Sequence, residues 1–417
     1  MPQSIRYAIS HSATCLVAVL LLGTIPSLAQ TAEGTAGWPA WLQQAMAEES
    51  LRIRTRSVDV ADGRYKFKLA GKPEKPEAID GGWYLASDIK AESPLECYVF
   101  NDDMDLATLV VTLANLNIDA TSSANGPVDN KSIYFLDAGA IDGVPFIALE
   151  WIYTVGEAPN ALIGFTKVRA AINNGLPQAC SHNSLGYRET FARAFEQFVR
   201  SARHTQSSAE PYYVEVLQQN LGNQPVGVAW MTYTLDVDGD TEVRTMDSAL
   251  IPVDNSTISF TDSSTLSYST PDGRLINEYT VMVENGELVT NLELGRSDDG
   301  NWSVSGTFQG KPLAHTIAGE FEPVSDLGQM RIAKELFASQ QLTSTVDIWA
   351  PQIDPTQFLQ ASLSRDDHEI ERQGKVVLGP MSMTAQFDRL GSILRSSMQM
   401  GAAEFRMDRV WVDGAPQ

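Results

Sequence analysis

Tyr279-Thr-Val-Met-Val-Glu-Asn-Gly-Glu-Leu-Val-Thr-Asn-Leu-Glu-Leu294 is the stretch of this chain that decides the fold. It contains two runs in which apolar and polar residues alternate, and this period of two is the pattern of a β-strand. The dipeptide Asn285-Gly286 separates the two runs, and Asn-Gly between alternating segments is a strong signal for a tight β-hairpin. We therefore expect an antiparallel hairpin here.

The same pattern of alternating segments separated by turn dipeptides extends over residues 212–417. Turn dipeptides recur at intervals of about a dozen residues, as in an up-and-down antiparallel meander. Such a sheet tends to curl, because strands twist and open edges are a liability. We therefore predict a mainly-β C-terminal domain, an antiparallel meander that forms a barrel or half-barrel, with one helix over Asp326–Ala338. The other turn dipeptides are Asp238-Gly239, Asp272-Gly273, Asp299-Gly300 and Gln309-Gly310.

Residues 30–200 mix two periods. Helical spacing is clearest from Ser184 to Arg203, whereas Val144–Val155 is strand-like and follows a turn signal at Asp142-Gly143. Residues 162–171 fit either a strand or a short helix. This mixture predicts an α+β N-terminal domain, an antiparallel sheet covered by helices. Residues 201–211 are small and polar and end in a proline, so they form the predicted linker between two domains.

The first 29 residues have the features of a signal peptide. Arg6 supplies a positive charge, Ala13–Leu22 is apolar, and Ser27-Leu28-Ala29 places small residues before a cleavage site between Ala29 and Gln30. The rival is a membrane anchor, but a spanning helix needs about 20 apolar residues. A lipid anchor would require Cys15 after the apolar run, and it stands at its beginning. We expect a periplasmic or secreted protein with no transmembrane segment after signal removal.

Cys97 and Cys180 are the two cysteines that remain after such cleavage. Exported proteins occupy oxidising compartments, so we predict a disulfide between them. The long loop that it closes corresponds to a stabilisation of at most about 4–5 kcal/mol. A reactive thiol or a metal ligand is the alternative, although the chain has no Cys-x-x-Cys spacing.

The formal net charge of the chain is −22 at pH 7, and basic clusters are absent. A chain so acidic repels phosphate backbones, so no nucleic-acid partner is expected. We interpret the charge as one that keeps the protein soluble, with a cationic substrate or partner as the alternative.

One strand-like segment, Gly227–Leu235, is apolar on both faces. Buried strands of this kind are either covered on both sides or line an apolar cavity. Methionines crowd the C-terminal strands, and methionine suits adaptable pockets as well as ordinary cores. If there is a cavity, Trp230, Tyr233 and Met383 are the side chains that we expect to line it.

An exported chain that ends in hairpins such as residues 279–294 resembles the curved-sheet proteins of the bacterial envelope. The best known of these are the periplasmic lipoprotein carriers, half-barrels with an apolar interior plugged by helices. The resemblance covers residues 212–417. It implies a hydrophobic-ligand cavity, and it provides no catalytic residues to carry over.

Three segments contain residue types of catalytic or metal sites. In Asp366-Asp367-His368-Glu369, a strand would aim only Asp366 and His368 to one side, so a metal would need a third ligand; a solvated loop is the rival interpretation. His182 is a candidate acid or base, with a surface or capping histidine as the alternative. Asp236–Glu242 resembles a calcium loop, but its glycine is misplaced and a hairpin turn fits better. No cofactor or metal is expected.

These observations favour an exported, non-enzymatic envelope protein that binds a hydrophobic ligand or an envelope protein. Two alternatives stay open. One is a secreted hydrolase with acids and His182 or His368 at the domain interface. The other is a purely structural envelope component.

Overall fold

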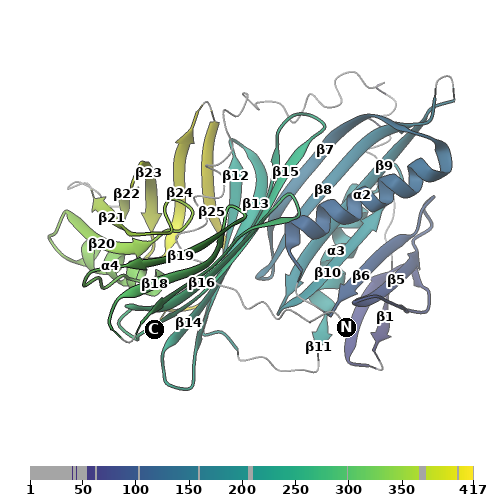
Figure 1. The fold of residues 1–417 in the computed structure, drawn as a ribbon. Coiled ribbons are helices and arrows are strands. Elements are labelled where there is room, and N and C mark those ends of the chain that lie inside the picture. Colours follow the sequence, from purple (N-terminus) through teal and green to yellow (C-terminus); the bar gives the residue numbers. More distant parts are fainter. Residues whose placement is uncertain are drawn as a thin grey trace.

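The structure is a computed structural model. It describes residues 40, 44, 54–61, 63–101, 104–157, 160–204, 210–297, 299–365, 372–401 and 403–416. The predicted leader, its predicted cleavage site, and Asp366 and His368 lie outside these residues. Within them the protein is mainly β, built from open antiparallel sheets (Figure 1).

Two sheets form the first half of the described chain. The larger is 8-stranded, and the smaller is 3-stranded. The larger sheet has the order β3 (Lys72–Pro73), β5 (Gly82–Asp88), β6 (Leu95–Phe100), β10 (Leu176–His182), β9 (Leu162–Asn173), β8 (Val144–Val155) and β7 (Val128–Ile141), with β4 (Glu77–Ile79) paired to β5. The smaller sheet contains β1 (Thr55–Val60), β2 (Tyr65–Ala70) and β11 (Arg203–His204). Residues 162–171, which fitted either a strand or a helix, are therefore a strand.

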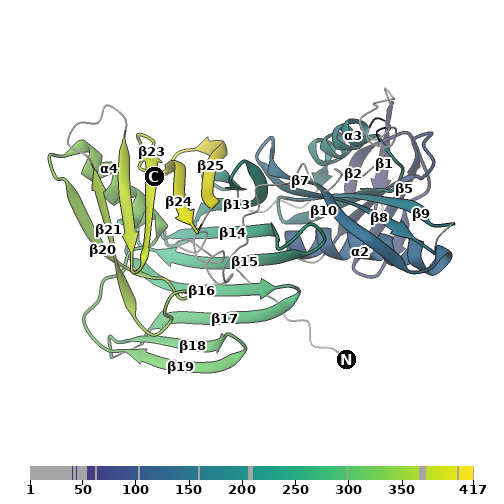
Figure 2. The ribbon, with the colours of Figure 1, turned by 90° about the horizontal axis from the view of Figure 1, so that it is seen from above.

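Two helices cover opposite faces of the larger sheet (Figure 2). Helix α2 (Leu106–Asn125) packs against β8 and β9, and its apolar face is buried there. Helix α3 (Arg188–Ser201) lies between the larger sheet and β2, where Phe198 contacts Phe67 at a ring-centroid distance of 4.8 Å. This arrangement of helices on antiparallel sheets is the one that the mixed periodicity predicts.

Cys97 and Cys180 form a disulfide. They are directly opposite each other on neighbouring strands β6 and β10, with their Cα atoms 4.0 Å apart. Both side chains are fully buried against α3. The predicted pairing is confirmed.

The second half of the described chain forms a single 14-stranded antiparallel sheet. Its order is β19 (Lys311–Ile317), β18 (Trp302–Phe308), β17 (Glu287–Arg296), β16 (Leu275–Glu284), β15 (Ile258–Ser269), β14 (Thr241–Pro252), β13 (Gln224–Leu235), β12 (Tyr213–Leu221), β25 (Ala403–Gly414), β24 (Ile393–Met400), β23 (Met381–Phe387), β22 (Gln373–Leu378), β21 (Phe358–Arg365) and β20 (Thr343–Trp349). The meander predicted from the turn dipeptides is present, and the hairpin at Asn285-Gly286 joins β16 to β17.

The two ends of this sheet, β19 and β20, form no ladder with each other in the described chain, but residues of both strands belong to one hydrophobic cluster. Trp302 of β18 contacts Phe358 of β21 edge to face, with ring centroids 5.4 Å apart. The segment 323–324 hydrogen-bonds to both arms of the sheet, the one that ends in β19 and the one that ends in β20. The Pro323 carbonyl accepts from Leu275 N–H of β16, and Val324 N–H donates to the Asp347 carbonyl of β20. Helix α4 (Asp326–Ala338), which follows this segment, has the predicted bounds.

One hydrophobic core joins the two halves. Val228 and Trp230 of β13 pack in the same cluster as α2, β7 and β8. Asp262 of β15 also accepts hydrogen bonds from the backbone N–H groups of Ala107 and Thr108, both at 2.8 Å, and so caps the first turn of α2. A division into two domains at residues 201–211 therefore stays a prediction.

Candidate ligand-binding cavity

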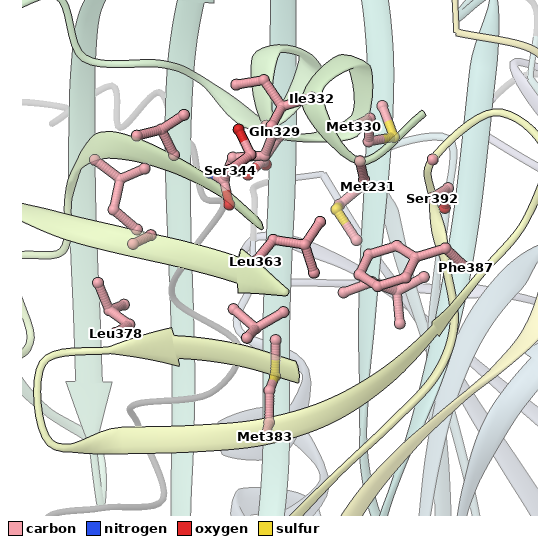
Figure 3. A pocket seen from close by; sticks show the side chains of 18 of the residues that line it. Met231, Gln329, Met330, Ile332, Ser344, Leu363, Leu378, Met383, Phe387 and Ser392 are labelled. Atoms are coloured by element: carbon pink, nitrogen blue, oxygen red, sulfur yellow. Dashed lines mark hydrogen bonds between the residues drawn. The ribbon is translucent and has the colours of Figure 1, made fainter. Parts of the chain in front are cut away.

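A cavity of about 170 Å³ lies between α4 and the 14-stranded sheet. Its wall is mainly aliphatic and sulfur-containing, and Figure 3 shows Met231, Leu363 and Phe387 converging beneath the helix that carries Gln329 and Met330. The apolar lining residues are Leu217, Met231, Met330, Ile332, Ala333, Val346, Ile348, Ala361, Leu363, Val376, Leu378, Met381, Met383, Phe387, Ile393 and Met407.

Strand β13 separates the cavity from the core between the halves. Met231 and Tyr233 point to the cavity side, whereas Trp230 points to the opposite face and packs in the cluster with α2. The cause is the alternation of side chains along a strand. Strand β13 is therefore apolar on both faces for two different reasons. One face lines the cavity, and the other is covered by the core between the halves. Tyr233 and Met383 line the cavity, and the expectation for Trp230 is corrected.

Glycines let α4 approach the sheet closely. A Cβ atom at Gly391 would lie 1.9 Å from the Met330 carbonyl oxygen, and one at Gly328 would lie 2.4 Å from the Gly273 carbonyl oxygen. Ser325 begins the helix, and its hydroxyl accepts from Gly328 N–H. These contacts fix the helix that forms one wall of the cavity.

The polar end of the cavity is built around Glu215 of β12, which is buried. Its carboxylate accepts hydrogen bonds from Tyr213, at 2.8 Å, and from the Ser392 hydroxyl. Arg409 lies 3.5 Å from the same oxygen and 2.8 Å from a carboxylate oxygen of Asp388. Burial raises the pKa of Glu215, and these partners oppose the rise.

A second buried carboxyl, that of Asp326 in the first turn of α4, has weaker support. Its Oδ1 accepts from Gln329 at 3.4 Å, and among the described residues its Oδ2 has no hydrogen-bond partner. The side chain lines the cavity, and the residue is only 8% exposed. Burial, followed by the negative charges of Glu278 and Glu215, raises the pKa of Asp326 well above its ordinary value.

Glu278 of β16 adds a third buried acid to this region. Burial raises the pKa of its carboxyl to about 8. The charge of Asp326 also raises the pKa of Tyr233, after burial itself. The cavity thus combines a large apolar wall with one strongly acidic end.

His182 is away from this cavity and is fully buried. Its ring packs near Tyr187 and Phe191, at centroid distances of 5.7 Å and 6.1 Å. Burial, followed by the charge of Lys167, lowers the pKa of His182 to about 3. Fully buried beside two aromatic rings, His182 has the environment of a core residue.

The acidic loop at residues 236–242 is a hairpin turn. Asp236 Oδ1 accepts from the N–H groups of Asp238 and Asp240, both at 2.9 Å, and so uses its oxygen to close the turn. In the described part of the chain, no group of three or more histidine, cysteine or acidic side chains is arranged to hold a metal ion.

Sequence reasoning missed the acidic end of the cavity. Glu215 and Glu278 stand in strand-like segments, where a single acid is ordinarily a solvent-facing residue. The only available signal concerned Asp326, because an acid directly after a serine marks the beginning of a helix. That signal says nothing about what faces the helix.

Comparisons with known proteins identify no family. No family model matches the chain, and no curated protein matches it. Among solved structures, a β-barrel-like protein of Domain of Unknown Function DUF1849 from Brucella abortus is similar, with 12% identity, 50% of this chain and 99% of that chain covered, and a TM-score of 0.38. A DUF1089 family protein from Pseudomonas aeruginosa has 13% identity, covers 40% of this chain and 87% of its own, and has a TM-score of 0.26. TM-scores this low support no argument about function.

Within the described residues, none of the helices is both long enough and apolar enough to span a membrane.

Proposed function

We propose that this chain is an exported protein of the bacterial cell envelope that holds a small hydrophobic ligand between α4 and the curved sheet. The observation that carries the proposal is the cavity of about 170 Å³ with its aliphatic and methionine lining. An engineered apolar cavity of about 150 Å³ stays dry and binds benzene, so a space of this kind favours an apolar occupant.

The methionines of the lining suit this role. Met231, Met330, Met381, Met383 and Met407 surround the cavity. Methionine has three rotatable bonds and a polarizable sulfur, so its side chain adapts to occupants of different shape. Such a wall can enlarge around a ligand without moving the strands.

The disulfide supports the exported part of the proposal, because disulfides persist in oxidising compartments. We expect the protein from the source organism to begin at Gln30, as read by N-terminal sequencing, and to resist alkylation until it is reduced. An intact leader on protein recovered from the cytosol, with both thiols open to alkylation, would contradict export.

Ligand binding is tested by native mass spectrometry and by lipid extraction of protein from its own source. The blocking variant is Ser344→Trp, because Ser344 is half-buried and lines the cavity. The matched control is Thr345→Trp, since the next residue of β20 is exposed. We expect the control and the unmodified protein to carry a bound apolar molecule that Ser344→Trp lacks.

Recovery of an empty protein in every case would exclude the ligand-binding role and leave a structural role in the envelope. Retention of the ligand by Ser344→Trp at the same occupancy would place the molecule elsewhere on the protein.

A further inference from the structure

We propose that the cavity selects a ligand with an apolar body and a positively charged amine, and that the carboxylate of Asp326 receives the amine. This inference rests on the proposed function and adds the chemistry of the polar end of the ligand. Asp326 then becomes a specificity-determining residue.

The first argument is the unused oxygen of Asp326. Its Oδ2 has no hydrogen-bond partner among the described residues, although the residue is only 8% exposed and lines the cavity. A buried polar atom without a partner costs free energy, because it has lost its hydrogen bonds to water. A donor on a ligand would remove that cost, and an apolar ligand would not.

The second argument is the local balance of charge. Glu215 is already satisfied by Tyr213, Ser392 and Arg409, and Arg409 is shared with Asp388. Among the described residues, Arg409 is therefore occupied by Glu215 and Asp388, and no ion pair reaches Asp326.

This balance predicts the sign of the ligand charge. Burial, followed by the neighbouring Glu278 and Glu215, raises the pKa of Asp326, so the empty site favours a proton on this carboxyl. An ammonium group supplies a positive charge in place of that proton, whereas a carboxylate would add one more acid to the same place. A fatty acid is therefore the wrong amphiphile for this end of the cavity.

The third argument is that the acidic end and the apolar wall of the cavity are joined by one helix. Asp326 and Ala333 belong to the same helix, and both line the cavity. An occupant with its amine at Asp326 can therefore lay its apolar body along the same wall, toward Ala333 and the methionines. A benzene-sized body fits the space available.

The test uses four probes of the same size: toluene, benzyl alcohol, benzylamine and benzoate. Binding is followed by NMR of methyl-labelled methionine, since five methionine side chains line the cavity. The variant is Asp326→Asn, which keeps the shape of the side chain. Glu335→Gln is the matched control, because Glu335 is an exposed acid on the same helix.

We expect benzylamine to bind about tenfold more tightly than benzyl alcohol and toluene, because hydrogen bonds to charged groups are the stronger ones. Benzoate should bind most weakly. Asp326→Asn should remove the preference for the amine without weakening toluene binding, and Glu335→Gln should change neither.

The outcomes separate the two proposals. If toluene binds but benzoate or benzyl alcohol equals benzylamine, or if the preference survives in Asp326→Asn, the amine inference is overturned and the apolar cavity stands. If none of the four probes shifts a methionine methyl resonance, the proposed function fails, and the inference fails with it.

Discussion

At the scale of single residues, the unusual feature of this protein is a group of acids inside the curved sheet. Glu278 is only 6% exposed, and burial raises the pKa of its carboxyl to about 8. On the neighbouring strand Thr265 is fully buried and hydrogen-bonds to Thr280 at 2.9 Å. Part of the sheet interior is therefore polar, in contrast to the aliphatic wall beside α4.

The raised pKa of Glu278 predicts a pH-dependent stability. The folded protein holds a proton that the unfolded chain releases near pH 4.5, so the free energy of unfolding falls as the pH rises from about 4.5 to about 8. Glu278→Gln removes this dependence. Above pH 8 the variant should be more stable than the original protein by up to a few kcal/mol, and below pH 4.5 the two should be similar.

Urea unfolding across this range measures the effect, with Glu287→Gln as the control because Glu287 is exposed in the same hairpin. Equal slopes of unfolding free energy against pH in Glu278→Gln and in the original protein would show that Glu278 does not titrate as described.

At this scale the sequence predicted the disulfide, but it did not predict the buried acids. Cys97 and Cys180 were paired correctly because the expected compartment and the number of cysteines left one partner each. Trp230 was assigned to the cavity because its strand is apolar on both faces, and only tertiary packing separates the two faces. The burial of Glu215 and Glu278 depends on strands far apart in the sequence, which local pattern does not reveal.

At the scale of elements, helix α2 depends on a residue of the other half. Its own N-cap residue, Asp105, makes no side-chain capping hydrogen bond, whereas Asp262 accepts from Ala107 N–H, Thr108 N–H and the Thr108 hydroxyl. Ser248 donates a fourth hydrogen bond to this carboxylate, at 2.6 Å. One buried side chain thus joins a helix to a sheet.

We expect Asp262→Ala to lower the free energy of unfolding by about 2–3 kcal/mol, because it leaves buried donors without an acceptor. Asp119→Ala should cost less, since Asp119 is an exposed acid on the same helix and takes no part in the cap. Chemical denaturation of both variants measures the difference. An equal or larger loss in Asp119→Ala would contradict the assignment of the cap to Asp262.

Helix α4 gives a second prediction at this scale. Gly391 and Gly379 both have positive φ angles, of 89° and 53°, but only Gly391 lies against the helix. An alanine at either position carries backbone strain, and at Gly391 its Cβ would also meet Met330. Gly391→Ala should therefore destabilise the protein more than Gly379→Ala, and amide hydrogen exchange in α4 should accelerate only in Gly391→Ala.

Equal effects of the two glycine variants on unfolding and on exchange would show that contact with α4 contributes nothing. The bounds of α4 were predictable, because its serine start and its apolar spacing are local. Its place against the sheet was not, since that depends on close approach at Gly273 and Gly391.

At the scale of the whole molecule, the two halves share one packed hydrophobic core. Trp230 is 6% exposed within this core, surrounded by residues of both halves. The sequence pattern correctly indicated a mainly β protein with antiparallel sheets, and the division between residues 30–200 and 212–417 stays a prediction. The pattern did not indicate that the two halves bury their apolar faces against each other, because nothing local marks an interface.

We predict that the intact protein unfolds in a single transition and that Trp230→Ala lowers its stability by about 3–5 kcal/mol. Leu235→Ala is the control, because Leu235 is 49% exposed on the same strand. Hydrogen exchange should accelerate in α2 as well as in β13 of the Trp230 variant. Two separate transitions, or an α2 that keeps its protection, would instead favour independent domains.

The unpaired ends of the 14-stranded sheet determine where the curved sheet can become wider. Strands β19 and β20 share no ladder in the described chain, so parting the two arms there would separate Trp302 from Phe358 and break the bridge at residues 323–324, but it would leave the paired strands intact. Widening anywhere else would break rows of inter-strand hydrogen bonds. The curved sheet can therefore widen at this seam without the loss of any inter-strand ladder.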